Sequence, residues 1–299
     1  MYILFAVLAL FSSVGNTIFN RISSHKISSL LSAVIKSFMI TFACLIICLC
    51  FGHIGELYSM SNEDWMWIGI LGLITIVDWL FYFLALKRSH LEAFAPFEVS
   101  TILFMSNLLF SFFMFYTVTN GGSALNVTLF YVGLALILAS MFYAVFNKKI
   151  NPIAKFTWVI FSVISATALV CTFLVVKLKL SHIHSDVIAF HQMLVVFVVS
   201  AIMLIFSKER REIKDVKPMT YLNFFISAIF NAGLMVFRYM ALTCANANPS
   251  IINIIVCCDF IIVSIATVLF FKAQNKKQLL VLIILVLAGM ILNALPAIL

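Results

Sequence analysis

Long apolar stretches, separated by short polar ones, follow one another along the whole sequence. A helix needs about 20 apolar residues to cross a bilayer, and none of these stretches shows the alternation of period two that is typical of a membrane β-barrel. The pattern therefore predicts an all-α, polytopic membrane protein. Ten transmembrane helices are expected, at residues 2–22, 28–51, 64–86, 91–116, 127–146, 156–176, 187–206, 220–242, 249–271 and 279–298.

The composition supports this class. Apolar residues make up 64% of the 299 positions and charged residues 10%, against roughly 45–50% and about 25% in soluble domains. The first apolar segment lacks the basic start and the cleavage pattern of a signal peptide, so we expect it to remain as a helix. The sequence contains no HExxH, GxSxG, Walker or GxGxxG motif, so neither an enzyme nor a cofactor is expected.

Lysine and arginine are distributed unevenly among the connections. Those after the odd-numbered helices contain fifteen, whereas the other connections and the two chain ends contain only Lys177 and Lys179. Cytoplasmic connections carry the excess of such residues, so we expect both termini on the extracytoplasmic side, in a bacterial inner membrane. Anionic lipid beside this basic rim explains the net charge of +8 without nucleic acid.

The sequence also resembles itself at an offset of 156 residues. Phe81–Leu86 then lies over Phe237–Leu242, and a short connection, a proline (Pro96 or Pro249) and a long apolar helix follow in each case. The match falls where a duplication of five helices would place it.

A duplication gives two units, residues 1–150 and 151–299, and the last helix of each contains one glycine, Gly133 or Gly289. Five is an odd number of spans, so the second unit is expected to be inverted relative to the first. Inverted repeats of this kind are typical of secondary transporters, whose substrate site lies near the bilayer midplane between the repeats.

The pattern F-x-x-x-A-L, short connection, proline and apolar helix resembles the EamA type of the drug/metabolite transporter superfamily. The resemblance implies a ten-helix transporter in which helices one, three, four, six, eight and nine surround a central cavity. The sequence departs from the family at three places. Small multidrug-resistance relatives have a glutamate where this chain has Asn16, and a frequent Glu-Arg pair is replaced at 117–119 and at 272–274. Substrate and coupling therefore cannot be transferred from the family.

Five ionisable residues lie inside predicted helices, away from the polar connections: Lys36, Asp78, Glu98, Arg238 and Asp259. Each costs about 2.5–3.5 kcal/mol in the hydrocarbon region, so such groups usually face a partner or a cavity. A rise of about 1.5 Å per residue puts the first three at nearly the same depth, about 12 Å from the cytoplasmic helix ends. Asp259 lies near the midplane, whereas Arg238 lies near an external end, where it could snorkel.

Two interpretations of these charges remain open. In one, a buried Lys36–Asp78 ion pair only locks two helices together. In the other, Lys36, Asp78, Glu98 and Asp259 line a translocation path and bind solute or protons, because carboxylates remain after Lys36 is paired.

Neighbouring side chains extend the predicted substrate site. Trp79 and Tyr82 flank Asp78 in the sequence, and aromatic rings beside a carboxylate suit an organic ammonium group. Asn231 is included in the predicted substrate site as a neutral polar side chain that could contact the solute. Three further asparagines either contact the solute or only bridge helices by hydrogen bonds: Asn16, Asn107 and Asn253.

Other potential ligands are interpreted as non-functional. His182, His184, Asp186 and His191 gather at the external start of the seventh segment, but their spacing matches no closed zinc pattern. We expect a solvated loop and no metal there, with proton sensing as an alternative. The seven cysteines lie in or beside apolar segments without a CxxC pair, which predicts inert thiols.

These features predict a secondary active transporter for a small polar metabolite: an amino acid, an amine or an organic cation. It would work by alternating access, with proton coupling as an option, as a monomer or homodimer among membrane lipids. One alternative is a channel with an acidic selectivity ring. Another is an intramembrane enzyme, which would need Asp78 and Asp259 within hydrogen-bonding distance.

Overall fold

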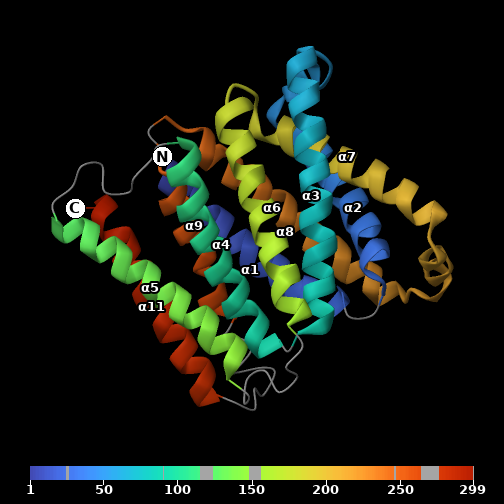
Figure 1. Ribbon diagram of the computed structural model, residues 1–299. Coiled ribbons are helices and arrows are strands. Elements are labelled where there is room, and N and C mark those ends of the chain that lie inside the picture. The colour runs from blue at the N-terminus through green and yellow to red at the C-terminus, as the bar shows by residue number, and fades with distance from the viewer. Residues whose placement is uncertain are drawn as a thin grey trace.

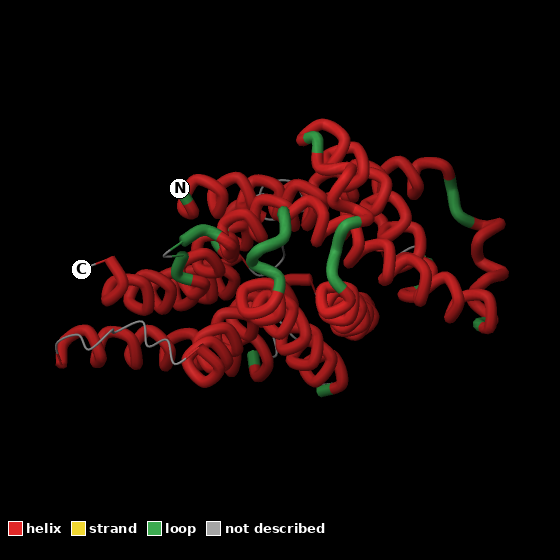
Figure 2. The backbone as a smooth tube through the Cα atoms, turned by 90° about the horizontal axis from the view of Figure 1, so that it is seen from above, coloured by secondary structure: helices red, strands yellow, loops and turns green. Residues whose placement is uncertain are grey.

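The computed structural model describes residues 1–24, 27–89, 91–114, 124–147, 156–245, 247–263 and 276–298. Positions 117–119 and 272–274, where the sequence departs from the EamA pattern, lie outside these residues. Every regular element in the described part of the chain is helical, and Figure 2 shows no strand there. The all-α class is therefore confirmed.

The helices follow the predicted segments closely. They are α1 (Tyr2–Ser24), α2 (Ser29–Phe51), α3 (Asn62–Arg88), α4 (Leu91–Met114), α5 (Ala124–Phe146), α6 (Thr157–Lys179), α7 (Ser185–Phe206), α8 (Pro218–Thr243), α9 (Pro249–Cys257) and α11 (Lys276–Ile298). Two 3₁₀ helices that the hydrophobic pattern did not predict follow α2 and α7: η1 (His53–Tyr58) and η2 (Lys208–Asp215).

Within the described residues, eight helices are long and apolar enough to cross a membrane. Two shorter apolar stretches complete the set: Phe97–Phe110 within α4, and Ile251–Val263, which begins in α9 and continues into the residues after it. The count of ten spans and the inverted relation of the two units stay predictions.

Local sequence signals explain several helix ends. The Ser28 hydroxyl accepts from the Leu31 amide and starts α2, and Gly52 ends the same helix in the left-handed region at φ 79°. Ser61 and Asp64 form a reciprocal capping box at the start of α3. Pro218 starts α8, where its missing amide hydrogen costs no hydrogen bond.

The ninth segment differs from the expected continuous helix 249–271. Helix α9 ends at Cys257, a turn follows at Cys258, and helical structure resumes at Asp259 and is described as far as Val263. Around the turn the backbone bonds join residues three apart, from the Cys258 amide to Ile255 and from the Ile261 amide to Cys258. This tighter pattern interrupts the α-helical ladder directly beside Asp259.

Helices from the two units pack in pairs. The main pairs are α1 with α8, α3 with α6, α2 with α7 and α5 with α11. Figure 1 shows α5 and α11 side by side at one end of the molecule, with α2 and α7 toward the other. Each pair joins a helix of residues 1–150 to one of residues 151–299, so the two units share one core.

The α5–α11 pair depends on two glycines. A Cβ atom on Gly133 would lie 2.7 Å from the Gly289 carbonyl oxygen, and a Cβ atom on Gly289 would lie 3.0 Å from the Gly133 carbonyl oxygen. Small residues allow membrane helices to approach this closely. The two glycines that the sequence offset aligned therefore contact each other.

Large apolar side chains also face outward. On α2, Phe38, Phe42, Ile46 and Leu49 are exposed at intervals of three to four residues, which places them on one helix face. An apolar surface of this kind is stable against lipid and not against water. The outer surface thus agrees with an integral membrane protein.

Candidate functional site

A cavity of about 170 Å³ lies among helices of both units. Its walls come from α1, α2, α3, α4, α6, α7, α8, α9 and the helical residues after Cys258. The cavity is several times larger than the roughly 30 Å³ that one water molecule occupies. It thus has room for a small organic solute.

All seven residues that the sequence grouped as a binding and coupling site line this one cavity. They are Lys36, Asp78, Trp79, Tyr82, Glu98, Asn231 and Asp259. They come from α2, α3, α4, α8 and the segment after α9. The fold thus brings together residues that lie up to about two hundred positions apart in the sequence.

Lys36 and Asp78 are both buried, and each is held by a neutral partner. The Lys36 ammonium donates to the Asn16 amide oxygen over 2.8 Å, and it lies 5.4 Å from the ring centre of Trp79. The Asp78 carboxylate accepts from the Ser165 hydroxyl over 2.6 Å. Among the ion pairs that the described residues form, none joins Lys36 to Asp78. The two charges are nevertheless close enough to interact, so the interpretation of these residues as a helix-locking pair stays open beside that of a binding site.

Asp259 connects the two units at the cavity wall. Its carboxylate accepts from the Ser13 hydroxyl of α1 over 2.5 Å. Because helical structure resumes at Asp259, the carboxylate also stands at the start of a helical segment, where backbone amide groups favour negative charge.

Arg238 is a cavity residue that the sequence interpretation misplaced. Its predicted place near a helix end allowed snorkelling to the surface, but the side chain is only 8% exposed and lines the cavity. Its guanidinium lies 4.6 Å from the ring centre of Phe173, and its charge is close enough to Asp78 and Asp259 to interact with both. The buried Nε of Arg238 makes no hydrogen bond to any described residue.

Gln192 was also missed. Its amide donates to the Thr75 hydroxyl over 2.7 Å and accepts from the Tyr239 hydroxyl over 2.5 Å, which joins α3, α7 and α8 at the cavity. A buried amide inside the apolar run of α7 was a usable signal, because such a group requires partners in lipid.

The remaining asparagines separate into two groups. Asn16 and Asn231 line the cavity. Asn107 donates to the Asn293 amide oxygen over 3.0 Å, and Asn253 donates to the Ser106 hydroxyl over 3.0 Å. Asn107 and Asn253 thus bridge helices, as one of the two interpretations proposed.

The histidines near the start of α7 do not share one site. His182 lies 3.0 Å from the Asp64 carboxylate, and Nδ1 of His191 lies 3.0 Å from the Val187 carbonyl oxygen. His184 and Asp186 instead meet residues of η1, an arrangement that sequence spacing could not show.

Buried charges around a cavity inside an apolar helical bundle are typical of polytopic membrane transporters. Comparison with known proteins supports the same class. Residues 156–295 match the EamA-like transporter family. This match confirms the resemblance to the drug/metabolite transporter superfamily, whose EamA members are transporters and not enzymes.

One solved crystal structure of a protein shares 16% sequence identity with this chain and superposes with a TM-score of 0.68. The superposition covers 98% of this chain and 97% of that one, so the fold is shared along the whole length. A search of curated proteins gives no match to the sequence.

Proposed function

We propose that this protein is a secondary active transporter that carries a small zwitterionic metabolite, of the amino-acid type, through the central cavity. The observation that carries the proposal is the mixed charge of the cavity wall. Three carboxylates (Asp78, Glu98, Asp259) and two cations (Lys36, Arg238) line one cavity. Five such groups are costly to place in lipid, which argues that they serve a solute.

The arrangement of these charges favours a zwitterion over a simple cation. A solute ammonium group in the cavity would meet the carboxylates of Asp78 and Asp259 and the rings of Trp79 and Tyr82, all of which line it. A solute carboxylate has the Arg238 guanidinium, whose Nε lacks a hydrogen-bond partner among the described residues. Arginine recognises carboxylates through paired N–H groups.

One formal negative charge remains on the cavity wall after the two cations are counted against the three carboxylates. A carboxylate that binds and releases a proton can couple solute movement to a proton gradient. We propose protons as the coupling ion. A bacterial inner membrane, which maintains such a gradient, is the proposed location.

Alternating access requires two units that can rock against each other, and the helix pairing supports this. In the predicted count of ten helices, α11 is the tenth and is therefore the counterpart of α5. Exchange of each helix with its counterpart in the other unit turns the α1–α8 pair into the α6–α3 pair and returns the α2–α7 and α5–α11 pairs to themselves. The reciprocal contact of Gly133 and Gly289 obeys the same exchange. Two-fold related units give contacts of this kind, so we propose inverted repeats at residues 1–150 and 151–299.

The test is a thermal-shift screen of the purified protein with matched solutes. Each amino acid is compared with its decarboxylated amine and its deaminated acid, because a ligand of the folded state raises its stability. We expect an intact amino acid to raise the melting temperature more than either truncated form. An equal shift with the amine alone would overturn the zwitterion proposal in favour of an organic cation.

The best ligand is then tested for counterflow in proteoliposomes. A carrier shows saturable exchange that is accelerated by solute on the opposite side. Single-channel currents in planar bilayers, without such acceleration, would replace the carrier by a channel with an acidic selectivity ring.

A further inference from the structure

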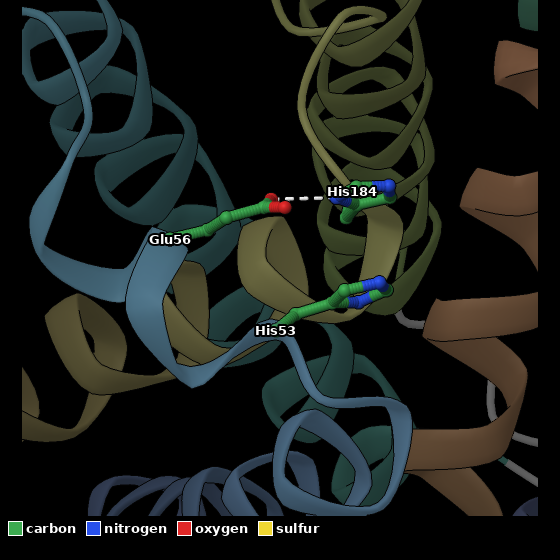
Figure 3. Close-up of side chains that lie close together, drawn as sticks. All are labelled: His53, Glu56 and His184. Carbon is green, nitrogen blue, oxygen red and sulfur yellow. Dashed lines mark hydrogen bonds and ion pairs between the residues drawn. The ribbon is translucent and has the colours of Figure 1, made fainter.

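Away from the cavity, a cluster of side chains capable of binding a metal joins the two units. His53 and Glu56 come from η1, and His184 comes from the connection between α6 and α7; both elements lie at the top of Figure 1. The potential ligand atoms of the three residues all lie within 4.8 Å of one another. Figure 3 shows Glu56 pointing toward His184, with Nδ1 of His184 2.5 Å from Oε2 of Glu56.

A buried carboxylate orients one of these histidines. Asp186 is 1% exposed, and its two oxygens lie 2.9 and 3.0 Å from Nδ1 of His53. A carboxylate only accepts hydrogen bonds, so Nδ1 of His53 donates and Nε2 keeps its lone pair. Metal-binding histidines usually have this carboxylate partner on the other ring nitrogen, which fixes the ring and strengthens the ligand.

We propose that His53, Glu56 and His184 form a binding site for Zn²⁺ or a similar divalent transition metal. Two imidazoles and one carboxylate suit zinc, whereas Ca²⁺ and Mg²⁺ prefer ligands that are all oxygen. Three protein ligands leave a fourth position for water, as in open zinc sites.

Binding of the ion requires a local rearrangement, because Nδ1 of His184 and Oε2 of Glu56 now lie only 2.5 Å apart, while the three ligand atoms all lie within 4.8 Å of one another. Tetrahedral zinc with bonds of about 2.0–2.2 Å places its ligand atoms about 3.4 Å apart. The rings of His53 and His184 now stack with their centres 3.9 Å apart and their planes 9° apart. Glu56 and His184 are 42% and 54% exposed, so rotation of their side chains is not opposed by close packing.

The position of the site suggests a regulatory effect, and this part rests on the proposed transport function. His53 and Glu56 belong to the first unit and His184 to the second, so a bound ion ties η1 to the α6–α7 connection. If the two units must separate at this face during alternating access, the ion slows transport.

The site is tested by titrating Zn²⁺ and, separately, Mg²⁺ into the purified full-length chain after removal of any histidine tag. Calorimetry and the melting temperature report binding. We expect one Zn²⁺ per chain and no response to Mg²⁺. His184→Gln and Glu56→Gln should each weaken Zn²⁺ binding about tenfold or more, while His182→Gln, two residues away and bonded to Asp64, should leave it unchanged.

Equal weakening by His182→Gln, or unchanged binding in both ligand variants, would overturn the proposed site. The melting temperature without metal shows whether each variant is folded. Counterflow measured with Zn²⁺ and with a chelator tests the regulatory effect. If Zn²⁺ binds without changing counterflow, the regulatory effect is rejected and the binding site stands. If no counterflow is seen either with Zn²⁺ or with the chelator, the result counts against the transport function alone.

Discussion

At the scale of single residues, the carboxylates of the cavity differ in what they connect. Asp78 accepts from Ser165, so it joins α3 to α6 inside the main packing between the units. Asp259 accepts from Ser13 and stands where the ninth segment is interrupted. A carboxylate at an interrupted helix can respond to a change of partner without disturbing a continuous helix, which makes Asp259 the better candidate for binding solute or protons.

The first prediction concerns this charge. Asp259→Asn keeps the side-chain shape and can still accept from Ser13, so we expect the melting temperature to change little. Loss of a charged partner, worth about 1.5–3 kcal/mol, should lower counterflow about ten- to hundredfold. Ser13→Ala is the matched control, because it removes the hydrogen bond from Ser13 to Asp259 but keeps the charge, and it should reduce counterflow less. A variant that no longer folds would show instead that Asp259 is structural.

The sequence was sufficient to select the charges inside the predicted helices but not to say which helix face each one occupies. A rise of about 1.5 Å per residue and the cost of charge in lipid selected Lys36, Asp78, Glu98 and Asp259, all of which line the cavity. The same rule misplaced Arg238, because depth does not tell whether a side chain faces lipid or Phe173 of a neighbouring helix.

At the scale of helices, the second prediction concerns the α5–α11 contact. Gly133→Ala would place a methyl group 2.7 Å from the backbone of Asn293 and Gly289, which cannot move aside as a side chain could. We expect overpacking of about 1–3 kcal/mol and a lower melting temperature in detergent. Gly69→Ala on α3 is the control, since nothing lies within 4 Å of the added atom, and alanine favours a helix. An unchanged melting temperature in Gly133→Ala would show that the two helices can separate freely.

Helix positions could be predicted well because hydropathy averaged over about 20 residues reports burial in lipid. The turn at Cys258 and the short helix η1 escaped the same average. The turn changes the hydrogen bonding of only a few residues in an apolar run, and η1 lies in a connection of ten residues between α2 and α3. Features of this length are decided by local backbone bonds that hydropathy does not register.

At the scale of the whole molecule, the sequence pattern alone could not predict which helices pack against each other. The offset of 156 residues aligned Gly133 with Gly289 but did not show that they touch. The cluster of His53, Glu56 and His184 was missed for the same reason, because His184 lies about 130 residues from the other two and meets them through the packing of α2 on α7.

The last prediction concerns the orientation of the whole chain in the membrane. The excess of lysine and arginine after odd-numbered helices includes η2, which contains Lys208, Arg210, Arg211 and Lys214 and should face the cytoplasm. The connection after η1 should then face outside. Single cysteines test this at exposed positions, with Ser59→Cys after η1 and Asp215→Cys at the end of η2.

Both changes are made in a background in which all seven native cysteines have been replaced by serine or alanine, because Cys50 is exposed and Cys171, Cys244 and Cys258 are partly exposed. A membrane-impermeant maleimide added to intact cells should label Ser59→Cys and not Asp215→Cys, and permeabilised cells should label both. The reverse pattern in intact cells would invert the predicted orientation. It would also place the proposed zinc site on the cytoplasmic face, because His53 and Glu56 lie in η1, directly before Ser59. The labelling therefore determines from which compartment a metal ion could reach the protein.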